Sequence, residues 1–285
     1  MRWCLFLFLA AVLLVARAPA QDTLRITDGF SEKSGYLPRK VIATGVVGSI
    51  FVLTAVDAYY SWWKDVEKPF SFYSENWFNG PHLGLDKLGH LFGSFVLFKI
   101  TRNLMLWGGY ERGTALWWAA GLSFFNGLVV EIGDGFSPYG FDYQDLIFNT
   151  CGVAFGVLQT QVPFLNNFNF KFSYYSKAGF KSPNRFTEDY DAMTIWLSMN
   201  VHGLLPSSVR DYWPEYINLA VGYGVDDNQT RREFVIGLDL NLEAFKTTNE
   251  DVLIAERIGN VMRLPLPAVT FIQGKPADFQ FFYLR

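Results

Sequence analysis

Three polar side chains at the start of an apolar segment have the spacing of one helix face. Asp86, His90 and Ser94 follow one another at intervals of four residues, so they would point the same way from an α-helix. A carboxylate and an imidazole on one face can bind a metal ion or move a proton. Gly89 and Gly93 lie beside this face, and we expect their lack of a side chain to let another helix come close.

Two later apolar segments carry carboxylates with matching spacing. Glu131 and Asp134 lie at the end of the segment around residues 124–134. In the next segment a narrow stripe at helical spacing is formed by Asp142, Asp145, Asn149, Gly152 and Gly156. Each stripe changes from acidic residues at one end to small residues at the other. We therefore expect three helices to cross closely and to gather their acidic ends into one polar cluster at the end of a bundle.

One hypothesis for this cluster is a metal-assisted or acid–base catalytic site. Its candidate catalytic residues are Asp86, His90, Glu131, Asp134, Asp142 and Asp145. Four of these would be the ligands of a divalent metal ion, namely His90, Glu131, Asp134 and Asp145. Such a site could activate water against an ester or phosphoester of an envelope lipid.

The alternative hypothesis is that the cluster has a structural or ligand-binding function. Asp86 and Asp142 would then be helix N-caps, and Lys87, Ser94 and Asn149 would belong to a polar network between helices. The sequence contains no H-E-x-x-H pair and no nucleophile elbow, which are the usual signatures of hydrolases. A structural or ligand-binding function is favoured for this reason, and whether the protein is an enzyme stays open.

Three elements in this order resemble a known family. They are D-K-x-x-H at residues 86–90, E-x-x-D at residues 131–134 and F-D-x-x-D-x-x-x-N-x-x-G-x-x-x-G at residues 141–156. The combination resembles the YfiM-like bacterial envelope proteins, many of them lipoproteins, which are grouped as a domain of unknown function. The similarity covers residues 84–161, and a looser likeness to VanZ-like membrane proteins depends on the same elements. It implies a bacterial cell-envelope protein and no particular activity.

The composition excludes one class of partner and suggests another. The net charge is -3 and there is no basic run, which argues against nucleic acid because phosphate binding requires clustered Lys and Arg. Half of the residues are hydrophobic, yet 18% are charged, which is too many for a chain that is mostly exposed to lipid. We expect a protein that is partly membrane-associated, with a membrane lipid or another envelope component as its partner.

The first residues have the pattern of a secretory signal peptide. A basic residue precedes the apolar run of residues 3–15, and Ala18-Pro19-Ala20 has the form of a cleavage site. We expect residues 1–20 to be removed and residues 21–40 to form a linker, the alternative being an uncleaved anchor. Gln21 stands where a lipobox requires cysteine, so no lipid anchor is expected. The predicted location is the cell envelope, associated with a membrane and facing the periplasm, with inner or outer membrane left open.

The pattern of apolar residues predicts the fold class. Residues 41–60 form an apolar segment long enough to cross a bilayer, and three more apolar segments follow at residues 88–107, 114–130 and 145–162. We expect a mainly α, membrane-associated bundle of about four apolar helices over residues 41–165, which either spans a membrane or rests on it.

A smaller α+β unit is predicted over residues 186–285. Its antiparallel hairpin would pair residues 216–225 with residues 233–245, where apolar residues alternate with the others along the second strand. One apolar face of this hairpin could bind a partner strand or cover the bundle as a lid.

Overall fold

The computed structural model describes residue 30 and residues 37–66, 68–74, 76–177 and 188–285. The predicted signal peptide and most of the predicted linker lie outside the described residues. The chain forms two compact units. The first is drawn from Met1–Glu75, Gly93–Pro163 and Thr247–Ala255, and the second from Asn76–Phe92, Phe164–Lys246 and Glu256–Arg285.

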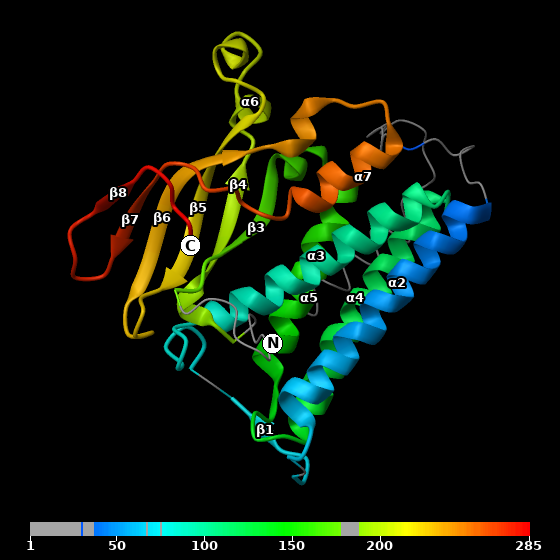
Figure 1. The fold of residues 1–285 in the computed structure, drawn as a ribbon, viewed down its shortest axis with the longest axis vertical. Helices are drawn as coiled ribbons and strands as arrows, with labels where there is room; N and C mark the ends of the chain where they lie inside the picture. Colours follow the sequence, from blue (N-terminus) through cyan, green and yellow to red (C-terminus); the bar gives the residue numbers. More distant parts are fainter. Residues whose placement is uncertain (1–29, 31–36, 67, 75, 178–187) are drawn as a thin grey trace. The chain divides into compact units, whose positions relative to one another are not determined.

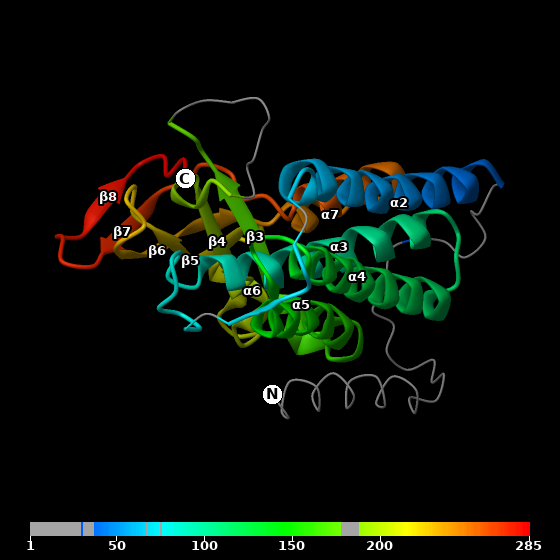
Figure 2. The same ribbon diagram turned by 90° about the horizontal axis from the view of Figure 1, so that it is seen from below.

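The first unit is helical. It contains α2 (Leu37–Ala58), which continues as a π-helix over Tyr59–Trp63, together with α4 (Arg112–Gly135) and α5 (Tyr143–Gln161) (Figures 1 and 2). Helix α3 (Leu85–Trp107) is unbroken, and its residues from Gly93 onward belong to this unit. The first turn of α7 (Glu250–Gly259) joins the unit through ion pairs of Arg39 with Glu250 and Asp251.

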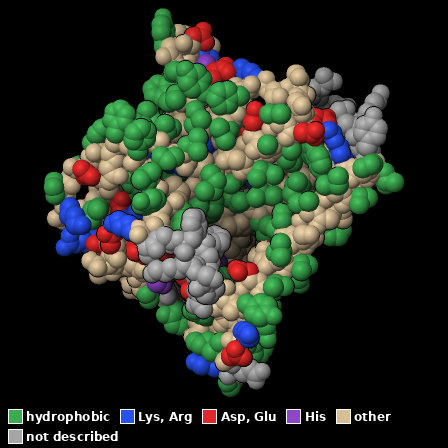
Figure 3. All heavy atoms as spheres, in the orientation of Figure 1, with side chains coloured by type: hydrophobic (Ala, Val, Ile, Leu, Met, Phe, Trp, Pro, Cys, Tyr) green, Lys and Arg blue, Asp and Glu red, His purple; other side chains and the backbone are tan. Residues whose placement is uncertain are grey.

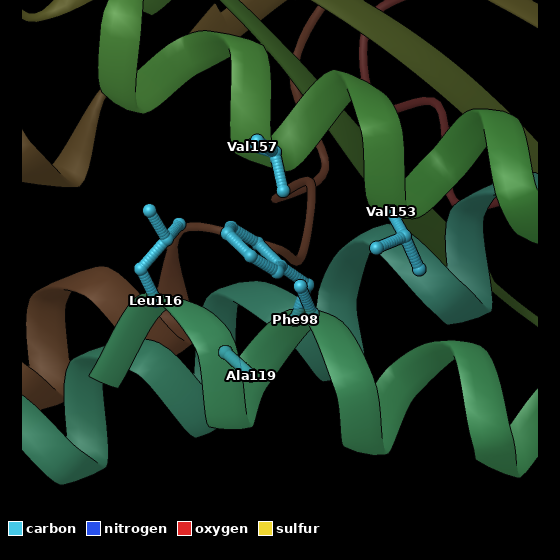
Figure 4. Packing of buried hydrophobic residues seen from close by; sticks show 6 residues of the cluster. Phe98, Leu116, Ala119, Val153 and Val157 are labelled. Atoms are coloured by element: carbon cyan, nitrogen blue, oxygen red, sulfur yellow. The ribbon is translucent and has the colours of Figure 1, made fainter. Parts of the chain in front are cut away.

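Helices α3, α4 and α5 share one hydrophobic core. Phe98 of α3 packs among side chains of the other two helices (Figure 4), and the cluster consists of Phe98, Leu116, Ala119, Ala120, Val153 and Val157. Two glycines allow this close packing, because a Cβ atom at Gly156 would collide with the Phe98 ring and one at Gly127 would collide with Asn149. Gly89 and Gly93 do not have the role expected of them, since no described atom comes within 4 Å of a Cβ built there.

Two helical glycines give a matched test of this packing. We expect Gly156→Ala to lower the free energy of unfolding by about 1–3 kcal/mol, because the new methyl group meets the Phe98 ring. Gly121→Ala is the control: its Cβ would meet open space on α4, so we expect a gain of about 0.5–1 kcal/mol from the higher helix propensity of alanine. Urea unfolding measures both values, and changes of the same sign would contradict the packing described here.

The second unit is built on a six-stranded antiparallel sheet in which every strand pairs with the next one along the chain. The strands are β3 (Phe168–Tyr174), β4 (Met193–Met199), β5 (Ile217–Val225), β6 (Arg232–Leu240), β7 (Ala268–Ile272) and β8 (Asp278–Gln280). The short helix α6 (Val201–Leu204) follows β4. The predicted hairpin corresponds to β5 and β6, which form the middle of this larger sheet.

The predicted fold class is wrong on two points. The described residues contain two helices that are long and apolar enough to cross a membrane, Leu37–Trp63 and Arg112–Gly135, and not a bundle of four. The other two predicted segments became α3 and α5, in which buried polar side chains such as Thr101, Asn103, Gln144 and Asn149 interrupt the apolar character. The C-terminal half is a six-stranded sheet and not a small unit with one hairpin, because strand periodicity shows single strands and not how many of them pair.

The two apolar helices differ in how much protein covers them. In the most apolar window of Leu37–Trp63 only 17% of residues are buried, against 39% in Arg112–Gly135. Helix α4 therefore contributes to the core described above, whereas α2 exposes large apolar side chains, among them Val41, Val52 and Leu53. Length and composition alone do not distinguish a membrane span from a core helix. Helix α4 buries one face in the core and exposes large apolar side chains such as Trp118 and Phe125 on another.

Candidate metal site

Helices α3 and α5 meet through a buried hydrogen bond. The Ser94 hydroxyl donates to Oδ1 of Asn149 at 2.8 Å. Further along both helices Phe98 lies against Gly156, so the two helices run in the same direction at this contact. His90 precedes Ser94 by four residues and Asp145 precedes Asn149 by four residues. Each of the two residues therefore lies on its own helix one turn before the hydrogen bond and on the same helix face as its bonded neighbour.

Helix α4 brings a second carboxylate to the same place. His90, Glu131 and Asp145 each offer one potential ligand atom, and these three atoms all lie within 4.8 Å of one another. Glu131 is 1% exposed, whereas His90 and Asp145 are partly exposed. The approach of α4 is possible because Gly127, one turn before Glu131, leaves room for Asn149. Each of the three stripes expected from the sequence supplies one of these residues.

The surroundings of Glu131 favour its protonated form. Burial, followed by the negative charges of Asp145 and Asp134, raises the pKa of Glu131 to about 9. The backbone N–H of Asp142 donates to Oε2 of Glu131 at 3.3 Å and lowers this pKa by a smaller amount. Without a bound cation, Glu131 therefore keeps a proton at neutral pH.

Asp134 and Asp142 lie near Glu131 but have their own partners. The indole N–H of Trp63 donates to Oδ1 of Asp134 at 2.8 Å. Asp142 is the N-cap of α5, where its Oδ1 accepts from the backbone N–H of Gln144 at 2.8 Å. Asp142 is held in place by a short parallel pairing of β1 (Phe72–Tyr73) with β2 (Phe141–Asp142). Neither aspartate belongs to the group of three close ligands.

Asp86 and Lys87 lie in the second unit. Lys87 is 1% exposed, and its Nζ lies 3.1 Å from Oδ2 of Asp86, its neighbour in the chain. Asp86 is not part of the group of three close ligands either. The six carboxylate and imidazole side chains proposed as catalytic thus divide into a close group of three and three residues with other contacts.

Two contributors to the site were missed in the sequence. Trp63 is not among the candidate site residues of the sequence, but its indole N–H donates to Oδ1 of Asp134. Gln144 is 1% exposed and donates from Nε2 to the Ser74 hydroxyl at 3.3 Å, which links the start of α5 to the preceding loop. Neither contact has a local signal, because each joins residues about 70 positions apart.

Comparison with known proteins gives one match. Residues 74–161 match the family model of a predicted periplasmic lipoprotein, DUF2279, and this range contains His90, Glu131 and Asp145. Comparisons with curated proteins and with solved structures gave no match. The match supports a domain of unknown function found in envelope lipoproteins, and it confirms the predicted export and cell-envelope localisation. It does not support the narrower YfiM-like name or the likeness to VanZ-like proteins.

Proposed function

We propose that this envelope protein binds a divalent metal ion through His90, Glu131 and Asp145. The observation that carries the proposal is the convergence of these three ligand atoms, from three different helices, within 4.8 Å. One imidazole and two carboxylates suit a borderline or hard ion such as Zn²⁺, Mn²⁺ or Fe²⁺. This is the ligand-binding function favoured by the sequence, with the ligand now given a chemical class.

The charges around Glu131 fit a cation. The ionised groups that act most strongly on this buried carboxyl group are other carboxylates, those of Asp145 and Asp134. Like charges at this separation in a buried place are costly unless one group takes a proton or a cation neutralises them. A bound metal ion would displace the proton of Glu131 and neutralise the charges of Glu131 and Asp145 together.

The same geometry favours metal-assisted hydrolysis as a second candidate function. Three protein ligands leave coordination positions open, as in catalytic zinc sites, whereas structural sites use four. His90 and Asp145 are partly exposed, which is a condition for water to reach an ion bound there. An ester or phosphoester of an envelope lipid is the substrate class that fits the localisation. Activity that depends on added metal and disappears with Glu131→Gln would support this candidate.

Elemental analysis of the purified full chain tests the metal proposal. We expect about one metal ion per chain after incubation with Zn²⁺ or Mn²⁺ and removal of excess ion, and an affinity lower by on the order of 100-fold or more in His90→Ala, because one of three ligands is lost. His202→Ala is the matched control, since the Nδ1–H of His202 donates to the Trp213 carbonyl and its Nε2 lies 3.5 Å from Glu215, and neither contact involves a proposed ligand. Equal metal content in His90→Ala and in the original chain would contradict the proposal.

A further inference from the structure

In the sheet of the second unit, polar side chains are common on the buried face and large apolar side chains occur on the exposed face, which is the reverse of the usual arrangement in water. Most side chains on its buried face are polar or small, with Lys171, Ser198 and Asp239 at 0% exposure and Thr270 at 3%, and they surround a small apolar cluster of Trp196, Val235 and Tyr283. Along β6 the buried residues alternate strictly with exposed or half-buried ones, and the exposed ones are apolar. An antiparallel sheet in water normally has the opposite arrangement, with apolar side chains inside and polar ones outside.

The strand register assembles the outward apolar residues into continuous rows. One row crosses four strands as Val221, Ile236, Val269 and Phe279. The neighbouring row contains Tyr223, Phe234 and Phe271. The large exposed members of this outward face are Val221 (41%), Phe234 (49%), Ile236 (50%), Phe271 (43%) and Phe279 (62%). Hydrophobic side chains are prominent over the strands in the space-filling view (Figure 3).

The same face of the sheet is covered at its other edge. On β4 the outward residues Met193 and Ile195 are buried with Leu85, and Leu88 and Phe92 pack against this cluster. The exposed rows begin where this cover ends, at β5, and they continue to β8. The unit therefore buries part of an apolar face in its own core and leaves the remainder uncovered.

The composition of the exposed rows indicates what covers them. A protein interface normally contains hydrogen-bonding groups and a polar rim, whereas no charged side chain occurs in the two rows and Tyr223 donates its hydroxyl proton to the Leu83 carbonyl within the unit. Apolar side chains outside and polar side chains inside are the arrangement that a lipid environment selects in strands. The family model that matches residues 74–161 describes a predicted periplasmic lipoprotein, which places the chain in the compartment that contains the envelope membranes.

We infer that the outward face of β5–β8 lies against the acyl chains of an envelope membrane. Burial of these rows in lipid would remove a large apolar surface from water, at about 25 cal/mol for each Å². The sequence located the expected membrane contact in the apolar helices, and this inference adds the sheet as a second contact. It is independent of the proposed metal site, because it uses no residue of that site.

A position-specific label is needed to test this contact, because α2 also exposes apolar side chains and could attach the protein to vesicles. The experiment uses the full chain with Cys4 and Cys151 replaced by alanine and a single new cysteine, Ile236→Cys, that carries an environment-sensitive fluorophore. The protein is reconstituted into phosphatidylcholine vesicles with or without bromine atoms on the acyl chains. Val252→Cys on α7 is the control, since Val252 is 45% exposed and lies outside the sheet.

We expect brominated acyl chains to quench the label at position 236 severalfold and to leave the label at position 252 unchanged. Phe271→Cys gives a second labelled position in the neighbouring row, which keeps the test valid if one variant fails to fold. Equal, weak quenching at all three positions in protein that floats with vesicles would overturn the inference. Efficient disulfide cross-linking of unlabelled Ile236→Cys between chains, without quenching, would also overturn it and would assign the face to a second copy of the chain.

Discussion

The metal-free protein is expected to lose stability as the pH rises, because Glu131 must give up a buried proton. Glu131→Gln is expected to remove this pH dependence. The pKa of Glu131 is about 9 in the folded protein, against 4.5 for an ordinary glutamate. Between these values the folded state keeps a proton that the unfolded state has released. The stabilising contribution is therefore complete below about pH 4.5 and is lost as the pH rises toward about 9. Each pH unit in this window costs on the order of 1 kcal/mol of stability.

Urea unfolding in a mild detergent, with a chelator present, measures this difference. Glutamine keeps the shape of the protonated carboxyl group but does not ionise, so the variant should gain stability relative to the original chain as the pH rises. Glu111→Gln is the matched control, because Glu111 is an exposed residue at the other end of α4 and its side chain makes no capping hydrogen bond. Parallel pH profiles for the original chain and Glu131→Gln would show that Glu131 ionises normally.

Addition of metal ion connects this measurement with the proposed function. A metal ion that binds the folded protein stabilises it in proportion to the logarithm of its concentration over the dissociation constant. We expect Zn²⁺ or Mn²⁺ to restore the stability of the original chain near pH 8, where the proton on Glu131 is easiest to displace. Glu131→Gln should show little of this effect. Equal stabilisation of the original chain and of Glu131→Gln would show that the ion binds at a different site.

Lys171→Met is expected to be among the most destabilising single substitutions in the chain. Lys171 and Asp239 are both 0% exposed and form an ion pair at 2.7 Å between β3 and β6. The lysine also donates to the Leu240 carbonyl and to Oδ1 of Asn260, each at 2.8 Å. Removal of the lysine leaves the buried carboxylate of Asp239 without its cation, which costs about 3–5 kcal/mol.

An exposed ion pair of the same length provides the control. Lys177 and Asp227 also lie 2.7 Å apart, but their side chains are 70% and 56% exposed. We expect Lys177→Met to change the free energy of unfolding by less than about 1 kcal/mol, because water screens the pair. The double variant Lys171→Met with Asp239→Leu should recover part of the lost stability, since it removes the uncompensated charge. Similar effects at both lysines would contradict the burial of the first pair.

The sequence by itself indicated which polar residues share a helix face. The four-residue spacing of His90 with Ser94 and of Asp145 with Asn149 is a local property, and the structure brings these residues together. The roles of the other carboxylates depended on distant residues. Asp134 binds Trp63, which lies 71 positions away, and no local pattern indicates such a contact. Which carboxylates remain close enough to share an ion was therefore decided by the tertiary structure.

The same division holds for the sheet. The alternation of side chains along residues 233–240 is visible in the sequence and predicts a strand with one apolar face. The sequence did not determine which face is buried, because a period of two is the same for either choice. The tertiary structure decided it when β3, β4 and β7 joined the hairpin and enclosed Lys171, Asp239 and their hydrogen-bond partners. Buried charges require partners from several strands, and only the assembled sheet supplies them.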